Sequence, residues 1–200
     1  MARDPELLRA APDAIAGELA AASSDAVRIE LLPYRSVLNV RGPATETFVH
    51  AVERQSGVAL PLAPNRWNGS DRRAAIWLGP DEWLLAAPDG EARALETAIR
   101  DACPDEPWLS VVDVSHNYTS FALSGPGTRE LLAGGCPLDL HPAAFGAGRC
   151  AQTLLAKTRV LLRALDDGNA IELWVRNSFA RYTAQWLLAS SAEPEVARTG

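Results

Sequence analysis

The chain lacks the features that define several common classes of protein. It has no apolar run near the roughly 18 residues of a membrane-spanning helix. It also has no Gly-rich phosphate loop and no G-x-S-x-G nucleophile motif. Its 19 Lys and Arg residues are outnumbered by 25 Asp and Glu residues, for a net charge of -6. This balance argues against a nucleic-acid-binding surface, which needs clustered cations.

Cysteine is scarce, and the N-terminus has no apolar segment typical of a secretory signal. The three cysteines form no C-x-x-C pair, which is typical of reduced thiols inside the cell. The first residues carry the charges of Arg3, Asp4 and Glu6 where a signal peptide would become apolar. We therefore expect a cytoplasmic protein that binds neither membrane nor nucleic acid.

The chain has enough apolar residues for a sizeable core. Its 200 residues are 48% apolar, which suits one domain or two fused half-domains that bury roughly 70% of the unfolded surface. Six Trp is a high number for this length. Trp fills cores and is also enriched at the centres of protein interfaces, so both uses remain open.

We predict an N-terminal extension at residues 1–26, one folded domain at 27–190 and a C-terminal tail at 191–200. The extension is Ala-rich and is interrupted by Pro5 and Pro12, so it either frays or lies across a partner. The alternation of apolar and charged residues from Val27 onward is typical of a half-buried strand.

The domain contains an internal repeat, with halves at about 36–105 and 110–190. Each half begins with a strand that ends in Gly-Pro, at Gly42-Pro43 and Gly125-Pro126. Each Pro is predicted to take the first position of the helix that follows. Two further strands and a second helix complete each half, so we predict an α+β fold of two β-α-β-β-α halves with antiparallel sheets.

Local patterns place the later elements of each half. The first half has strands at 75–78 and 83–87, and the polar stretch 65–73 around Trp67 is predicted to be a surface loop. In the second half, strands at 158–165 and 170–175 flank a hairpin turn. The last helix is predicted to start at a Ser178 cap. Its buried stripe is predicted to comprise Phe179, Tyr182, Thr183 and Trp186.

Asp113, Ser115 and His116 are reminiscent of a hydrolase triad, but strand geometry argues against one. Neighbouring side chains of a strand point to opposite faces, so Ser115 and His116 should not share a hydrogen bond. We interpret Asp113 and Ser115 as acceptors for backbone donors at a strand end, with His116 hydrogen-bonded in the turn.

Cys136, His141 and Cys150 are the candidate metal ligands. Their spacing matches no common zinc knuckle, and Pro137 and Pro142 make the segment a rigid loop. We therefore expect no metal here.

Two motifs carry a resemblance to known families. The quartet Asp113–His116, the alternating strand after it and Gly125-Pro126 resemble the aminomethyltransferase (T-protein) fold of folate-dependent one-carbon enzymes. The block Gly135-Cys136-Pro137-Leu138-Asp139-Leu140-His141-Pro142 is similar to the gamma-subunit family of heterotetrameric sarcosine oxidase. Residues 78–84 and 175–180 support the same match, which covers about residues 28–190.

The resemblance implies a partner subunit and not an enzyme that acts alone. Complexes of that family oxidatively demethylate sarcosine to glycine, release hydrogen peroxide and pass the one-carbon unit to tetrahydrofolate. FAD, FMN, NAD and folate are implied for the large alpha and beta subunits, and zinc for the delta subunit. We therefore expect no catalytic, cofactor-binding or metal-binding residues in this chain. The alternatives are a subunit of a related N-methyl amino acid dehydrogenase and a free-standing folate-binding protein.

The folate alternative depends on the stretch Gln152–Arg163. In the catalytic relatives, the matching strand runs into a Gly-Gly loop and an acidic pair. Here the Gly-Gly loop is missing, and no acidic residue lies between Arg149 and Asp166. Thr158 and cationic neighbours stand in the place of the carboxylate, so the charge-assisted hydrogen bond to folate is lost.

Overall fold

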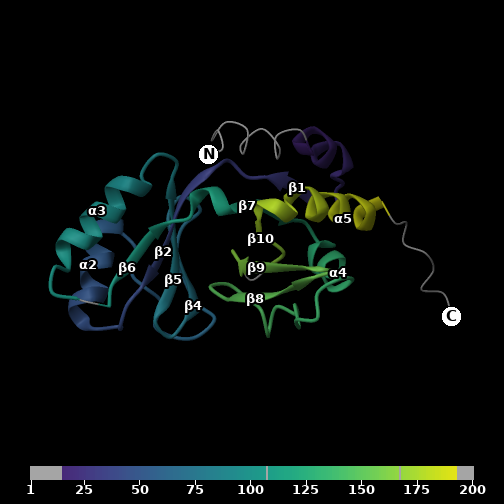
Figure 1. Cartoon of the computed structure of the whole chain (residues 1–200). Coiled ribbons are helices and arrows are strands. Elements are labelled where there is room, and N and C mark those ends of the chain that lie inside the picture. The colour runs from purple at the N-terminus through teal and green to yellow at the C-terminus, as the bar shows by residue number, and fades with distance from the viewer. Residues whose placement is uncertain (1–14, 107, 167, 193–200) are drawn as a thin grey trace. The chain divides into compact units, whose positions relative to one another are not determined.

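The computed structural model describes residues 15–106, 108–166 and 168–192, and the chain forms two compact units (Figure 1). Unit 1 holds the described residues up to Pro33, Tyr118–Ala147 and those from Gln152 onward. Unit 2 holds Tyr34–Asn117 and Gly148–Ala151. Each unit has a five-stranded sheet with antiparallel central strands and flanking helices, which confirms the predicted α+β class.

Unit 2 packs two helices against one face of its sheet. Its elements are β2 (Arg35–Arg41), α2 (Glu46–Ser56), β3 (Trp67–Gly69), β4 (Ala74–Gly79), β5 (Glu82–Pro88), α3 (Ala92–Ala102) and β6 (Ser110–Asp113). The strand order is β3-β4-β5-β2-β6. Alternate residues of β2 and β5 face the helices, so Leu38, Val40, Trp83 and Leu85 share a core with Phe48 of α2.

Side-chain caps fix where these two helices begin. The Thr45 hydroxyl accepts the N–H of Phe48 at the start of α2. The sequence-based prediction that Pro43 and Pro126 take the first helical positions is wrong, because the helices that follow begin at Glu46 and Thr128. The Ser36 hydroxyl of β2 accepts the N–H groups of Glu91 and Ala92 at 2.9 and 3.0 Å, so this strand positions the start of α3.

Unit 1 contains a sheet of the order β1-β7-β10-β9-β8. Its elements are a helix at 15–22, β1 (Arg28–Leu31), β7 (Tyr118–Ser124), α4 (Thr128–Ala133), β8 (Cys150–Leu155), β9 (Thr158–Ala164), β10 (Ile171–Arg176), η2 (Asn177–Phe179) and α5 (Ala180–Ala192). The two residues at the start of β8 belong to unit 2. Residues 1–14 of the predicted extension and 193–200 of the predicted tail lie outside the described residues.

Three sequence-based expectations differ from the structure. Residues 15–22 of the predicted extension form a helix with Ile15 and Leu19 buried. The predicted loop at 65–73 contains the short strand β3. The last helix is predicted wrongly in part. Ser178 lies within η2 and does not cap the helix, and Phe179 of the predicted stripe is 45% exposed and precedes α5. The side chains that α5 buries are Ala180, Thr183, Ala184 and Leu187.

The strands of the two units correspond one to one, and their outermost strands are exchanged. The orders β3-β4-β5-β2-β6 and β8-β9-β10-β7-β1 describe the same sheet built twice. β1 precedes β2 in the chain but pairs with β7. β6 precedes β7 but pairs with β2. Residues 110–113, which begin the second predicted half-repeat, therefore complete the sheet of unit 2.

A buried ion pair lies in the sheet of unit 1. Arg163 of β9 stands opposite Glu172 of β10, and its Nε donates to the Glu172 carboxylate. The two side chains are 0% and 1% exposed. A buried charge is costly unless its partner is also present, so these two residues stabilise the unit only as a pair.

We predict that Glu172→Leu lowers the free energy of unfolding by about 3–5 kcal/mol, because it leaves the Arg163 charge buried without its carboxylate. The double variant Arg163→Met, Glu172→Leu should lose much less, and urea denaturation measures both. As a control, Glu30→Gln breaks the exposed pair Arg28–Glu30 and should cost about 1 kcal/mol or less. A double variant as unstable as Glu172→Leu would contradict this account.

Candidate functional site

The Asp113 turn joins the end of β6 to the short helix η1 (Ser115–Asn117). Asp113 Oδ1 accepts the Ser115 N–H at 2.9 Å and the Ser115 hydroxyl at 2.5 Å. The Ser115 hydroxyl accepts the N–H of Val37 at 2.9 Å. His116 Nδ1 lies 2.8 Å from the Tyr34 hydroxyl. These bonds confirm that Asp113 and Ser115 accept backbone donors at the strand end and that His116 is bonded in the turn.

This arrangement does not resemble an activated nucleophile. A catalytic serine needs an exposed hydroxyl and a base that is held by a third group. Ser115 is only 5% exposed, and its hydroxyl lies between the Asp113 carboxylate and a main-chain amide of β2. The group therefore fastens the end of β6 to β2.

The candidate metal ligands each have a local partner. Cys136 Sγ lies 3.7 Å from the Thr153 hydroxyl, and Cys150 Sγ donates to the Arg66 carbonyl at 3.2 Å. His141 Nδ1 accepts the N–H of Ala143 at 3.2 Å. Within the part of the chain that the structure describes, no three His, Cys, Asp or Glu side chains gather as metal ligands would.

The third cysteine, Cys103, is also buried. Desolvation by burial raises the pKa of its thiol, and the nearby Glu106 carboxylate adds to the rise. A raised pKa keeps the sulfur protonated at neutral pH, which disfavours a nucleophilic role.

An arginine that the sequence analysis missed anchors the Gly135–Pro142 block. Arg129 of α4 donates to the carbonyls of Leu140, Phe145 and Gly168 at 2.5, 2.9 and 2.7 Å. Gly135 allows a second close approach, because a Cβ there would lie 2.5 Å from the Trp186 ring. The segment that carries the family resemblance is thus held by main-chain contacts and close packing.

The stretch compared with the folate strand forms β8, a short turn and β9. Lys157 lies in that turn, and its N–H donates to the Tyr182 hydroxyl at 3.3 Å. Arg163, at the end of the stretch, is held by Glu172 from β10. Its buried charge is therefore balanced within the sheet. Arg163 and Glu172 are each three residues from the ends of the predicted turn at 166–169, so a symmetric hairpin places them opposite each other. The sequence therefore contained the information needed to predict this ion pair.

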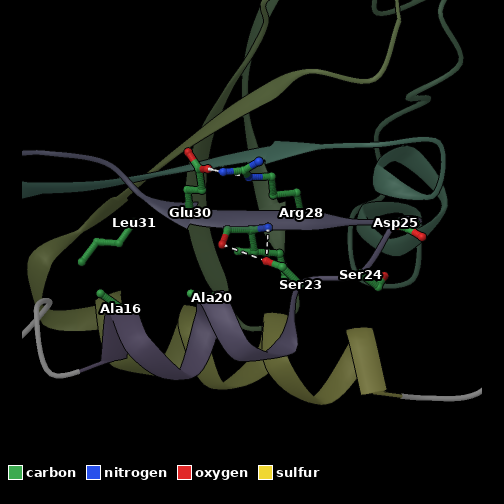
Figure 2. Close-up of a pocket in the computed structure, with 9 residues that line it drawn as sticks. Ala16, Ala20, Ser23, Ser24, Asp25, Arg28, Glu30 and Leu31 are labelled. Atoms are coloured by element: carbon green, nitrogen blue, oxygen red, sulfur yellow. Dashed lines mark hydrogen bonds and ion pairs between the residues drawn. The ribbon is translucent and has the colours of Figure 1, made fainter.

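A hollow of about 520 Å³ lies beside β1 in unit 1, between this strand and the helix at 15–22 (Figure 2). The Ser23 hydroxyl accepts the N–H of Ile29 at 3.0 Å and lies 3.3 Å from the carbonyl of the same residue. Arg28 Nε donates to Glu30 Oε1 at 2.6 Å. Ser23, Arg28 and Glu30 of this hollow thus have hydrogen-bond partners within unit 1.

A second hollow, of about 550 Å³, lies in unit 2. It is lined by Arg41, Gly42, Pro43, Asp81, Trp108 and Ser110. Trp108 is 80% exposed, whereas Trp83 of the same unit is fully buried. Nothing in the local sequence pattern separated these two Trp residues, because exposure depends on tertiary packing.

Comparison with solved structures defines the class of fold. The chain overlays on the glycine cleavage system aminomethyltransferase T from Bartonella henselae with a TM-score of 0.58. The overlay covers 87% of this chain and 48% of that chain at 14% identity, so the likeness concerns the fold alone. The protein has an aminomethyltransferase-like fold, as the resemblance predicted.

Comparison with sequences defines the family. Residues 41–193 match the Sarcosine oxidase, gamma subunit family. Sarcosine oxidase subunit gamma of Corynebacterium sp. (strain U-96) is 34% identical over 173 residues, which are 86% of this chain and 82% of the relative. The same subunit of Arthrobacter sp. is 33% identical, over 86% of this chain and 83% of the relative. The chain belongs to the sarcosine oxidase gamma subunit family.

A solved complex gives the same result. A chain of the heterotetrameric sarcosine oxidase from Corynebacterium sp. U-96, in complex with pyrrole 2-carboxylate, overlays with a TM-score of 0.84 at 33% identity. The overlay covers 94% of this chain and 97% of that chain. In the part of this protein that the structure describes, no helix has the length and apolar character to cross a membrane.

We predict that Ser115→Ala lowers the free energy of unfolding by about 1–3 kcal/mol, because the Val37 N–H loses its acceptor in a buried position. Chemical denaturation of the variant measures the loss. Ser110→Ala, at a half-buried serine of β6, is the control and should change stability by about 0.5 kcal/mol or less. Equal effects of the two substitutions would contradict the assigned role of Ser115.

Proposed function

We propose that this chain is the gamma subunit of a heterotetrameric sarcosine oxidase and acts there as a docking subunit without a catalytic centre of its own. The observation that carries the proposal is the overlay on a chain of the solved heterotetramer, which extends over nearly the full length of both chains. A relative that differed in its assembly would be expected to diverge over at least one large segment.

The geometry of the polar groups supports a non-catalytic role. The carboxylate of Asp113 is bound to Ser115, and the buried Glu172 is bound to Arg163. A general acid or base must be within reach of a substrate proton. The buried Glu172 does not meet that condition, and Asp113 Oδ1 already accepts two hydrogen bonds from Ser115. The missing Gly-Gly loop and acidic pair argue in the same way against a folate site.

The proposed assembly divides the chemistry between subunits. The large alpha and beta subunits would carry FAD, FMN, NAD and tetrahydrofolate, and the small delta subunit would carry zinc. The whole complex, in the cytoplasm, would oxidise sarcosine and release glycine and hydrogen peroxide. This chain would contribute packing surface to the complex and no reacting group.

We predict that the chain co-purifies with the alpha, beta and delta subunits in a 1:1:1:1 assembly when the four are expressed together. An affinity tag on the alpha subunit and the mass of the eluted complex test this. Recovery of the chain alone, together with calorimetric binding of tetrahydrofolate at micromolar concentration, would favour the free-standing folate-binding alternative. Turnover of another N-methyl amino acid but not sarcosine would favour the dehydrogenase alternative.

We predict that Asp113→Asn and His116→Ala leave turnover per assembled, flavin-loaded complex within about threefold of the original. A general acid or base normally contributes about 10²-fold or more, so this range separates structural from catalytic roles. Both variants should lower the melting temperature, because they break hydrogen bonds of the turn. A hundredfold loss of turnover in intact complex would show that these side chains take part in catalysis.

A further inference from the structure

One edge of unit 2 presents an exposed apolar surface, which we call the Trp108 patch. It consists of Trp108, Ser110 and Val112 from the β6 region and Arg41 and Pro43 from the β2 end. Trp108 is 80% exposed, the largest fraction among the large apolar side chains of the described residues, and Val112 is 45% exposed.

The strand register places the members of this patch on one side of the sheet. Ser110 of β6 pairs with Arg41 of β2, and Val112 pairs with Asn39. Residues two apart on a strand share a face, so Ser110 and Val112 project on the same side. Trp108 lines one hollow together with Arg41 and Ser110, so its indole stands beside this row.

The patch is suited to side-chain contact and not to the addition of a strand. β6 is the outer strand of its sheet, and an exposed edge can recruit a foreign strand. Here the guanidinium of Arg100 donates to the Val111 carbonyl at 2.5 Å, which occupies part of that edge. A partner would therefore meet the Trp108 indole and the Val112 side chain face on.

The charges around the patch define the partner further. Arg41 Nε lies 4.0 Å from Glu82 Oε2, so its charge is partly balanced within the chain. Among the described residues, the exposed Asp81 carboxylate has no counter-ion within 4.0 Å. The hollow beside Trp108 is lined by Arg41 and Asp81, and the Asp81 carboxylate is the one of the two without an ion-pair partner among the described residues, which favours a Lys or Arg side chain beside the apolar centre of the partner.

We propose that the Trp108 patch is the surface through which this chain binds a large flavoprotein subunit. The complementary site on that subunit is an apolar pocket that receives the indole and is rimmed by Lys or Arg side chains facing Asp81. Trp is among the residues most enriched in interface hot spots, which lie in well-desolvated pockets near the centre of an interface. This inference rests on the proposed function, because it takes its partner from that complex.

The test compares two truncations of exposed apolar side chains in unit 2. Trp108→Ala should weaken binding to the tagged large subunits at least about 30-fold, the effect of an interface hot spot. Leu62→Ala is the matched control, because Leu62 is 59% exposed and lies outside the patch. It should change binding less than about threefold. Thermal melting of both isolated variants should match that of the unaltered chain, since neither side chain is part of the core.

A charge variant tests the rim separately. Asp81→Lys should slow association with the large subunits about tenfold at low salt, because it reverses the attraction to a basic rim. Added salt should slow association of the unaltered chain, and the variant should lose this dependence. Association rates measured by surface plasmon resonance between 50 and 300 mM salt separate the two cases.

The outcomes distinguish this inference from the proposed function. If the unaltered chain assembles with the large subunits and Trp108→Ala assembles equally well, the patch is not the interface and the proposed function stands. If the unaltered chain binds no flavoprotein subunit, both proposals are overturned. Loss of self-association in Trp108→Ala with unchanged binding to the large subunits would assign the patch to a second copy of this chain and overturn the inference.

Discussion

The architecture of unit 1 depends on the ion pair between Arg163 and Glu172. Ile171 to Val175 are all buried, so neither face of β10 tolerates an unpaired charge. A slip of one residue between β9 and β10 would separate the two charges and turn each toward the opposite face. The pair therefore disfavours a slipped register of β9 against β10. The observed register directs Ile171, Leu173 and Val175 to one face as a continuous apolar surface.

Structural features that depend on residues close together in the sequence could be predicted, and features that depend on distant residues could not. The apolar strand at 83–87 and the antiparallel pairing of the strands at 158–165 and 170–175 were predicted correctly, because short apolar runs and turn residues encode them locally. The short β3 was missed because three residues carry no readable period. The buried face of α5 was misassigned because small residues such as Ala180 and Ala184 carry it, whereas large aromatic residues dominate a hydrophobicity pattern.

The candidate site shows the same division. The bonds of Asp113 and Ser115 were predictable, because a polar residue at a strand end usually satisfies nearby backbone groups. The roles of Arg129 and Trp108 were not. The carbonyls that Arg129 binds come from two segments, 140–145 and Gly168, that lie 11 to 39 residues away in sequence. The exposure of Trp108 is set by how the chain packs around it. Both depend on tertiary structure, and periodicity does not report it.

The exchange of outer strands has a consequence for how the protein is made. While the ribosome synthesises the first half, β1 has no strand to pair with, because β7 has not yet emerged. The Ser23 hydroxyl bonds both main-chain groups of Ile29, which face the outer edge of β1, so the edge that pairs with β7 stays open during the delay. The sheet of unit 2 has no such delay, because all five of its strands precede β7 in the chain. The sheet of unit 2 can thus form first on the nascent chain, whereas β1 stays unpaired until β7 has been synthesised.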